Sequence, residues 1–400
     1  MGFCNTQDVL LSLLSKALFQ KPSDIDTDID FEALYKESAQ QTVSSLVFTA
    51  LPKGIKSDVI KKWELEFNMD LLFYSKLSFA HTQIHTLMSN ADIPYVILKG
   101  CVSASYYKDP MLRKSGDVDF LVRECDYVKA QKLLLDNGFL CTDTHHEYEM
   151  SFEKDGIVFE LHRKINGIPD NKSSEKFQRL FDDIFDNAVL LKNDFYEFIA
   201  PDKFCHGLIM LLHIARHMLT GGIGLRHLCD WAVFVDSIKD DFETIFKEKL
   251  RSVGLWKFAQ ILCALSVKYL GCPQIPFAED VDKDLLSALK NDIFEGGNFG
   301  HKDLNRADEA KFITSRKDGG VSKKSNFMQA VISANEIVRR HWKFADKCPL
   351  VYPFGWLFFG ARYGVRTIFK KREKKNINAL IKGADKRKEI YKEIELFIEG

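Results

Sequence analysis

Two aspartates, two positions apart, are the residues of this sequence that most directly suggest chemistry. Asp117 and Asp119 lie in the segment Arg113-Lys-Ser-Gly-Asp-Val-Asp-Phe-Leu-Val122. Alternate residues of a β-strand project from the same face, so a strand here places both carboxylates side by side. Such carboxylates repel each other, and a divalent cation, Mg²⁺ or Mn²⁺, relieves that repulsion. The pair therefore predicts a metal site, and the alternative is a solvated strand face at a sheet edge.

The residues around this pair suit a phosphate ligand. Gly116 directly precedes the aspartates and permits close approach of a ligand to the backbone. Arg113 can neutralise charge on a polyphosphate. Lys99 and Gly100 end the preceding apolar run just before a predicted helix, where phosphate contacts commonly form. The predicted nucleotide-binding residues are Lys99, Gly100, Arg113, Ser115 and Gly116.

A third carboxylate follows on a later strand-like segment. Glu160 lies within Ile157-Val-Phe-Glu-Leu-His162 and can place its side chain beside the two aspartates. Clustered carboxylates can bind paired metals that stabilise the attacking and leaving oxygens of an in-line displacement at phosphorus. The predicted catalytic and metal-binding residues are Asp117, Asp119 and Glu160. The sequence contains no competing Ser-His-Asp or Walker signature.

Helix and strand signals alternate around these residues. Apolar, β-branched runs predict strands at Tyr95–Leu98 and Asp117–Arg123, and Asp126–Asn137 is typical of an amphipathic helix with Asp126 as its N-cap. The segments 149–152 and 157–162, around Lys-Asp-Gly, predict a hairpin. We therefore expect an α+β protein in which a small mixed-sheet core is embedded in a largely helical chain.

This pattern divides the chain into four regions. We expect an N-terminal helical region at 1–91, the α/β core at 92–165, a helical domain that completes the cleft at 166–300, and a C-terminal helical region at 301–400.

Several motifs together resemble the polymerase-β-type nucleotidyltransferases, in particular their bacterial "nucleotidyltransferase family protein" branch. The similarity covers about 92 to 240. The motifs that carry it are Leu98-Lys-Gly100, Arg113-x-x-Gly-Asp-x-Asp119, Asn137-Gly-Phe139, Phe159-Glu-Leu-His162, His213-Ile-Ala-Arg-His217 and Gly221-Gly-Ile-Gly-Leu-Arg-His-Leu-Cys-Asp230.

The resemblance implies an NTP bound through magnesium, with Asp117 and Asp119 at the metal-binding positions. Glu160 matches the third acidic position, where it binds metal or serves as a base. The better-known members carry Gly-Ser ahead of the acidic pair, whereas this chain has Lys99-Gly-Cys101. Lys99 or Ser103 is the candidate replacement for that serine.

The expected reaction is transfer of a nucleoside monophosphate from an NTP to a hydroxyl-bearing acceptor, with release of pyrophosphate. A small molecule or sugar is the first candidate acceptor, followed by an RNA end and then a protein side chain. A catalytically silent nucleotide-binding or scaffold protein is the alternative. The sequence identifies neither the acceptor, nor the nucleotide, nor an oligomeric state.

Three further residues are candidates for the acceptor site: His162, His217 and Arg226. His213 and His217 are four residues apart, as zinc ligands on a helix often are, but the glutamate of a His-Glu-x-x-His motif is missing. Packing or acceptor contacts are therefore favoured over a metal. An ion pair with Asp230 on the helix surface is the default interpretation of Arg226.

Composition limits the partners and the location. The 400 residues contain 56 Lys and Arg and 56 Asp and Glu, so no global field favours nucleic acid or membrane. The nine cysteines include no Cys-x-x-Cys pair, and neither a leader nor a membrane span is evident, so we expect reduced thiols and a cytoplasmic protein.

The segment 352–372 is aromatic and then basic. A helix packed on the core with a solvated basic end is favoured. Peripheral contact with an anionic membrane surface, or with a nucleic-acid backbone, is the alternative.

Overall fold

The structure is a computed structural model that describes residues 5–23, 29–143, 149–169, 173–278, 281–303, 351–359 and 377–397, with isolated positions from 305 to 342. The chain divides into two compact units: Met1–Leu304 with Glu389–Gly400, and Asn305–Lys388. His145 and His146, which the sequence indicates as surface histidines or a substrate contact in preference to a metal site, lie outside the described residues. So does the basic part of the segment 352–372.

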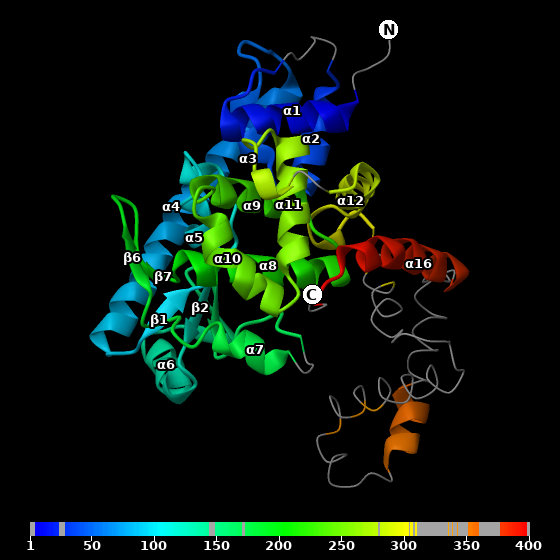
Figure 1. Cartoon of the computed structure of the whole chain (residues 1–400). Helices are drawn as coiled ribbons and strands as arrows, with labels where there is room; N and C mark the ends of the chain where they lie inside the picture. Colours follow the sequence, from blue (N-terminus) through cyan, green and yellow to red (C-terminus); the bar gives the residue numbers. More distant parts are fainter. Residues whose placement is uncertain are drawn as a thin grey trace. The chain divides into compact units, whose positions relative to one another are not determined.

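The first unit contains a five-stranded mixed sheet (Figure 1). Only the contact between β2 and β5 is parallel, and the other neighbours pair antiparallel. In spatial order the strands are β1 (Tyr95–Ile97), β2 (Asp117–Val122), β5 (Ile157–His162), β4 (Glu149–Lys154) and β3 (Leu140–Asp143).

The two faces of β2 have opposite character. Val118, Phe120 and Val122 are buried in one apolar core with residues of the long helix α4 (Asp58–Asn90) and of α6 (Tyr127–Asp136). Because side chains alternate along a strand, the aspartates of β2 face the other way. The apolar side thus fixes β2 in the fold, and this fixes the direction of its carboxylates.

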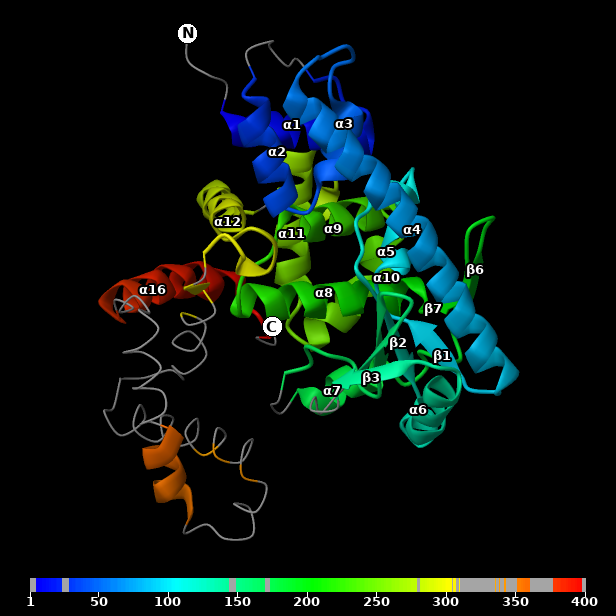
Figure 2. The ribbon, with the colours of Figure 1, turned by 180° about the vertical axis from the view of Figure 1, so that it is seen from behind.

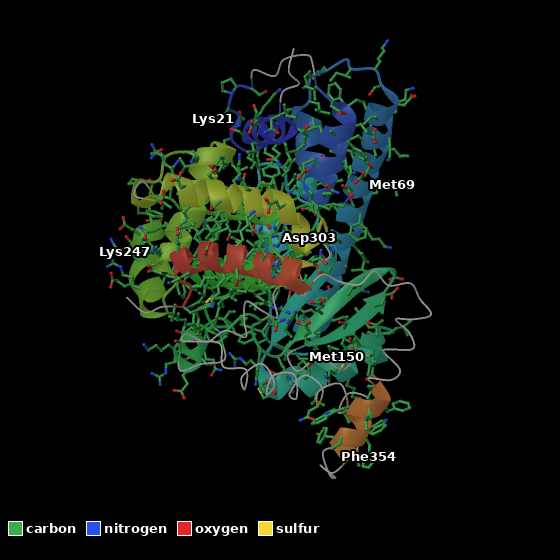
Figure 3. All side chains as sticks on the ribbon, turned by 90° about the vertical axis from the view of Figure 1, so that its right-hand side faces the viewer. Lys21, Met69, Met150, Lys247, Asp303 and Phe354 are labelled. Atoms are coloured by element: carbon green, nitrogen blue, oxygen red, sulfur yellow. The ribbon has the colours of Figure 1, made fainter. Side chains whose placement is uncertain are left out.

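Four helices precede the sheet. They are α1 (Thr6–Phe19), α2 (Phe31–Gln40), α3 (Ser44–Ala50) and α4. Side chains cap three of them, since Asn5, Asp30 and Ser57 accept hydrogen bonds from backbone N–H groups of α1, α2 and α4. Figure 2 shows α4 running from this helical group to the sheet. Met69 marks its exposed side in Figure 3.

Helices also follow the sheet. They are α7 (Ser174–Arg179), α8 (Lys203–Leu219), α9 (Leu225–Ser237), α10 (Phe242–Ser252), α11 (Trp256–Leu270) and α12 (Lys283–Gly296). Residues of two of them, α8 and α9, line a cavity together with Asp117. A two-stranded sheet of β6 (Val189–Lys192) and β7 (Glu197–Ala200) precedes α8, and β7 packs into the core of the main sheet. Asp202 caps α8 by accepting a hydrogen bond of 2.7 Å from the N–H of Cys205.

The second unit contains a small aromatic cluster. Val338 and Tyr352 are buried there, with Trp342, Val351, Trp356 and Phe359 packed against them. The described part of the aromatic segment, 352–359, is helical as predicted, and Phe354 is exposed on it (Figure 3). Helix α16 (Ile377–Ile394) follows.

The expected α+β class is confirmed, as are both predicted strands and the hairpin. Asp126 precedes α6 as predicted, but its side chain makes no capping hydrogen bond. Strands β3, β6 and β7 were not predicted. In the described part of the chain no helix is long and apolar enough to cross a membrane.

Candidate active site

Three side chains from neighbouring strands converge on one face of the sheet. Asp119 on β2 and Glu160 on β5 are register partners in the parallel ladder. One ligand atom each from Asp119, Glu160 and His162 lies within 4.8 Å of the others. Asp117, two residues before Asp119 on the same face, is half-buried. The structure therefore brings the predicted acidic residues to one side of β2 and β5 and adds a histidine to them.

His162 lies among carboxylates. Its Nε2 is 3.1 Å from Oδ1 of Asp119 and 3.5 Å from Oε2 of Glu160, and its Nδ1 is 3.2 Å from Oε2 of Glu149. Burial alone would lower the pKa of His162, but the hydrogen bonds with Asp119 and Glu160 raise the pKa to about 9. We expected His162 at an acceptor site, and the structure places it beside the acidic residues. A signal existed, because residues 160 and 162 share one face of a strand.

Lys99 is the cation closest to Asp119. Its Nζ is 3.0 Å from Oδ1 of Asp119, a side chain that is 1% exposed. Burial would raise the pKa of Asp119, but Lys99 and His162 outweigh burial and lower it. The second oxygen of Asp119, Oδ2, is buried without a hydrogen-bond partner. A buried carboxylate oxygen of this kind fits a metal ligand, because a hard divalent cation prefers carboxylate oxygens.

The negative charge of Asp119 helps to raise the pKa values of the other two carboxyl groups, those of Asp117 and Glu160. The charge of Asp119, followed by burial, raises the pKa of Asp117. The hydrogen bond with His162 lowers the pKa of Glu160, but burial and the charge of Asp119 raise it overall. The repulsion predicted from the Asp-x-Asp spacing is therefore present, and a divalent cation at these oxygens would relieve it.

Arg113 has a positional role that the sequence did not indicate. The Arg113 side chain is 7% exposed. It donates two hydrogen bonds to Asp230 on α9, from Nη2 to Oδ2 at 2.7 Å and from Nε to Oδ1 at 3.0 Å. Tyr107 donates a third hydrogen bond to Asp230 at 2.7 Å, and Arg113 also donates to Ser115. This bidentate pair joins the segment before β2 to α9. Asp230 is therefore buried and paired with Arg113, and the expected surface ion pair with Arg226 is wrong.

A cavity of about 170 Å³ is lined by Asp117, whereas Asp119 and Glu160 do not line it. From the sheet side, its lining includes Lys99, Gly100, Arg113, Gly116 and Asp117. Gly100 has a φ of +66°, in the region that favours glycine. Four of the five predicted nucleotide-binding residues thus line one cavity. Ser115 does not line it and instead accepts the hydrogen bond from Arg113.

Helices close the opposite side of this cavity. Its lining there includes His213 and Met210 of α8, Arg226 and His227 of α9, and Phe299. Arg226 thus faces the same cavity as Lys99, whereas His217 packs behind it against Phe299, with ring centroids 4.5 Å apart. His227 and Phe299 were not predicted. His227 lies within the Gly221–Asp230 motif that carries the family resemblance, but we gave it no role, and the segment 295–300 that contains Phe299 is one we interpret from the sequence as a loop.

A comparison with known families gives one match. The family described as "uncharacterised nucleotidyltransferase" matches residues 27–271, more than half of the chain. No curated protein and no solved structure matches the chain. The matched range includes the sheet, the acidic residues and helices α8 and α9.

Proposed function

This chain belongs to the family of uncharacterised nucleotidyltransferases, and we propose that its carboxylates form the centre of a metal-dependent nucleotidyl transfer. The proposed reaction moves a nucleoside monophosphate from an NTP to a hydroxyl group of an acceptor and releases pyrophosphate. Family membership gives the class of reaction. The metal, the acceptor and the residue roles are proposals.

The observation that carries the proposal is that ligand atoms of Asp119 and Glu160 lie close together and that Oδ2 of Asp119 is buried without a hydrogen-bond partner. Asp117, Asp119 and Glu160 would hold Mg²⁺ or Mn²⁺ through carboxylate oxygens. The bound cation would stabilise negative charge that develops on the transferred phosphate. Glu160, whose pKa is raised, is either the third metal ligand or the acceptor of the proton from the attacking hydroxyl.

Lys99 is proposed to contact the NTP phosphates. It lines the cavity and at the same time lies 3.0 Å from Asp119, so its ammonium group borders both the carboxylates and the space for a ligand. Arg113 adds positive charge to the cavity, but its donors are engaged by Asp230 and Ser115. We therefore propose that Arg113 positions the segment that leads into Asp117. Gly100 and Gly116 line the cavity beside it.

The proposed acceptor is a small molecule or a sugar. A nucleic-acid end is less favoured, because 56 basic and 56 acidic residues supply no net attraction for a polyanion. Residues of α8 and α9 line the cavity together with Asp117, and its volume of about 170 Å³ suits a compact acceptor better than a macromolecule.

Thermal stabilisation by nucleotides tests this proposal. The melting temperature of the protein should rise with each accepted NTP in the presence of Mg²⁺, because a ligand that binds only the folded state stabilises it. The rise should shrink in Lys99→Ala and should persist in Lys192→Ala, which removes an exposed lysine outside the cavity. An NTP response that is the same in Lys99→Ala as in the wild type would remove Lys99 from phosphate binding.

A further inference from the structure

On the helical side, the cavity is lined by His213, Arg226, His227 and Phe299, and His217 packs against Phe299 without lining the cavity. These five residues are here called the histidine wall. The ring centroids of the histidines lie 4.4 to 5.8 Å apart. Phe299 lies 5.2 Å from the ring of His227, and the guanidinium of Arg226 lies 5.5 Å above the ring of Phe299. No step proposed above uses this wall.

Two loops, 221–224 and 297–300, pack closely against each other next to the histidine wall. A Cβ atom at Gly221 would come within 2.5 Å of the carbonyl oxygen of Phe299, and one at Gly300 would collide with the carbonyl group of Gly221. A Cβ atom at Gly224 would lie 2.8 Å from the Cα of Asn298. Phe299 itself has a φ of +56°, which a residue with a side chain adopts at a cost. The glycine-rich segments therefore permit backbone-to-backbone packing that fixes the position of Phe299.

Arg226 differs from the other cations around the cavity. Lys99 pairs with Asp119, Arg113 with Asp230, and Lys114 with Asp70. Among the residues that the structure describes, no carboxylate forms an ion pair with Arg226. Its Nη1 donates to the carbonyl of Lys114 at 3.2 Å, and its Nε is buried without a partner.

Burial, followed by the charge of Arg113, lowers the pKa of Arg226 to about 10, so its side chain remains charged at neutral pH. The charges of Asp230 and Asp117 raise the pKa of Arg226 and offset part of this effect, but neither carboxylate forms an ion pair with it. A largely desolvated cation of this kind is stabilised when an anion binds beside it.

His227 supplies a second unsatisfied donor. Its side chain is 3% exposed, and its Nδ1 accepts a hydrogen bond of 3.4 Å from the N–H of Gly224. Burial lowers the pKa of His227 well below its usual value, so the ring is neutral. A neutral imidazole that accepts at Nδ1 carries its proton on Nε2. That Nε2 is buried without a partner, and His227 lines the cavity.

We propose that Arg226 and His227 form an oxyanion subsite that binds a phosphate group across the cavity from the carboxylates. The donors here are N–H groups, which suit phosphate oxygens and not a metal ion. Within the described ranges, the one histidine and carboxylate group close enough to hold a metal is Asp119, Glu160 and His162. Assignment of the phosphate to the β- and γ-positions of the NTP, and so to the pyrophosphate product, rests on the proposed function.

Calorimetric titration with pyrophosphate, ATP and AMP, each with Mg²⁺, tests the subsite. Arg226→Gln should weaken pyrophosphate and ATP about tenfold or more, because a hydrogen bond to a charged group is lost. His227→Phe, which keeps a ring but no donor, should weaken both by a smaller factor. AMP affinity should change less than about twofold. Arg216→Gln is the matched control, since Arg216 is exposed on α8 and does not line the cavity.

A second set of measurements keeps the proposal testable and separates the source of the phosphate. Arg226→Lys retains the charge and should bind pyrophosphate more tightly than a folded Arg226→Gln variant. If Arg226→Gln does not fold, His227→Phe tests the subsite by itself. If the subsite instead holds a phosphate of the acceptor, inorganic phosphate should bind beside saturating ATP in the wild type and not in Arg226→Gln.

Equal affinities for pyrophosphate, ATP and phosphate in the wild type, Arg226→Lys, Arg226→Gln and His227→Phe would overturn the subsite. A wild type that binds pyrophosphate through Arg226 but transfers no nucleotide would contradict the proposed function and leave the subsite intact.

Discussion

The two sides of the cavity carry opposite kinds of charge. On the sheet side, Asp119 and Glu160 bring ligand atoms within 4.8 Å of each other, and the charge of Asp119 raises the pKa of Asp117. Lys99 and His162 pair with Asp119. On the helical side, burial lowers the pKa values of the three histidines of the wall, which leaves them neutral. Arg226 is the cation there, and no described carboxylate pairs with it.

This difference indicates what each side is built to hold. Excess negative charge on the sheet side suits a divalent cation, whereas unsatisfied N–H donors on the helical side suit an anion. A metal-bound polyphosphate presents both kinds of charge. The following predictions test whether the two sides differ in this way.

The largest stability effect is expected where the two sides are joined. Asp230→Ala leaves the buried Arg113 without its partner and should lower the free energy of unfolding by about 3–5 kcal/mol. Urea denaturation measures this loss. Asp236→Ala, which removes a solvent-accessible ion pair with Lys239 at the C-terminal end of α9, should cost less than about 1 kcal/mol. A loss below about 1 kcal/mol in Asp230→Ala would show that this pair does not hold α9 to the segment before β2.

The two aspartates should respond oppositely to the same substitution in the metal-free protein. Asp119→Asn removes the partner of Lys99 and His162 and should lower the free energy of unfolding by about 3 kcal/mol. Asp117→Asn relieves repulsion by Asp119 and should leave stability unchanged or raise it by about 0.5 kcal/mol. Chemical denaturation in the presence of EDTA measures both. Equal destabilisation of the two variants would contradict the unequal pairing of the carboxylates.

The histidine wall should make the protein sensitive to acid. In the unfolded chain histidine titrates near pH 6.5, whereas burial lowers the folded pKa of His217 to about 3 and that of His227 well below its usual value. Below pH 6.5 the unfolded state therefore binds more protons, and stability falls as the pH decreases. His227→Gln should reduce the slope of the free energy of unfolding against pH, measured by urea denaturation between pH 6.5 and 5, by up to about 1.4 kcal/mol per pH unit.

The acid sensitivity is due to the histidine wall only if a substitution in the wall changes the pH dependence of the free energy of unfolding. His81 and His206 also have pKa values that burial lowers, to about 4 and about 3, so they supply a background slope. They remain in His227→Gln, and the difference from the wild type isolates one residue of the wall. An unchanged slope in His227→Gln would mean that His227 is not held neutral by burial.

Much of the sheet side could be predicted from the sequence because its signals are local. The alternation of Asp117 and Asp119 with Val118 and Phe120 indicates which face bears the carboxylates. The hairpin turn at Lys154-Asp-Gly156 is equally local, and it delivers Glu160 on the strand that pairs with β2.

The helical side depends on contacts that no local pattern contains. Arg113 and Asp230 are separated by 117 residues, and Phe299 reaches His217 only through packing of two distant loops. Arg226 and Asp230 are spaced for an ion pair on one helix, but burial beside Arg113 decides the partner. Periodicity shows which face of a helix is polar, and it does not show what that face meets.

The account depends most directly on the carboxylates of β2. The decisive measurement is transfer of label from an α-labelled NTP into an acceptor present in a cell extract, with purified protein and Mg²⁺. The wild type should transfer label only when a divalent cation is present. Asp117→Asn, which we expect to fold, should transfer about 10³-fold less, because stabilisation of the charge at the α-phosphate is lost. Transfer that persists in Asp117→Asn, or that proceeds equally in EDTA, would contradict a metal-dependent centre at this site.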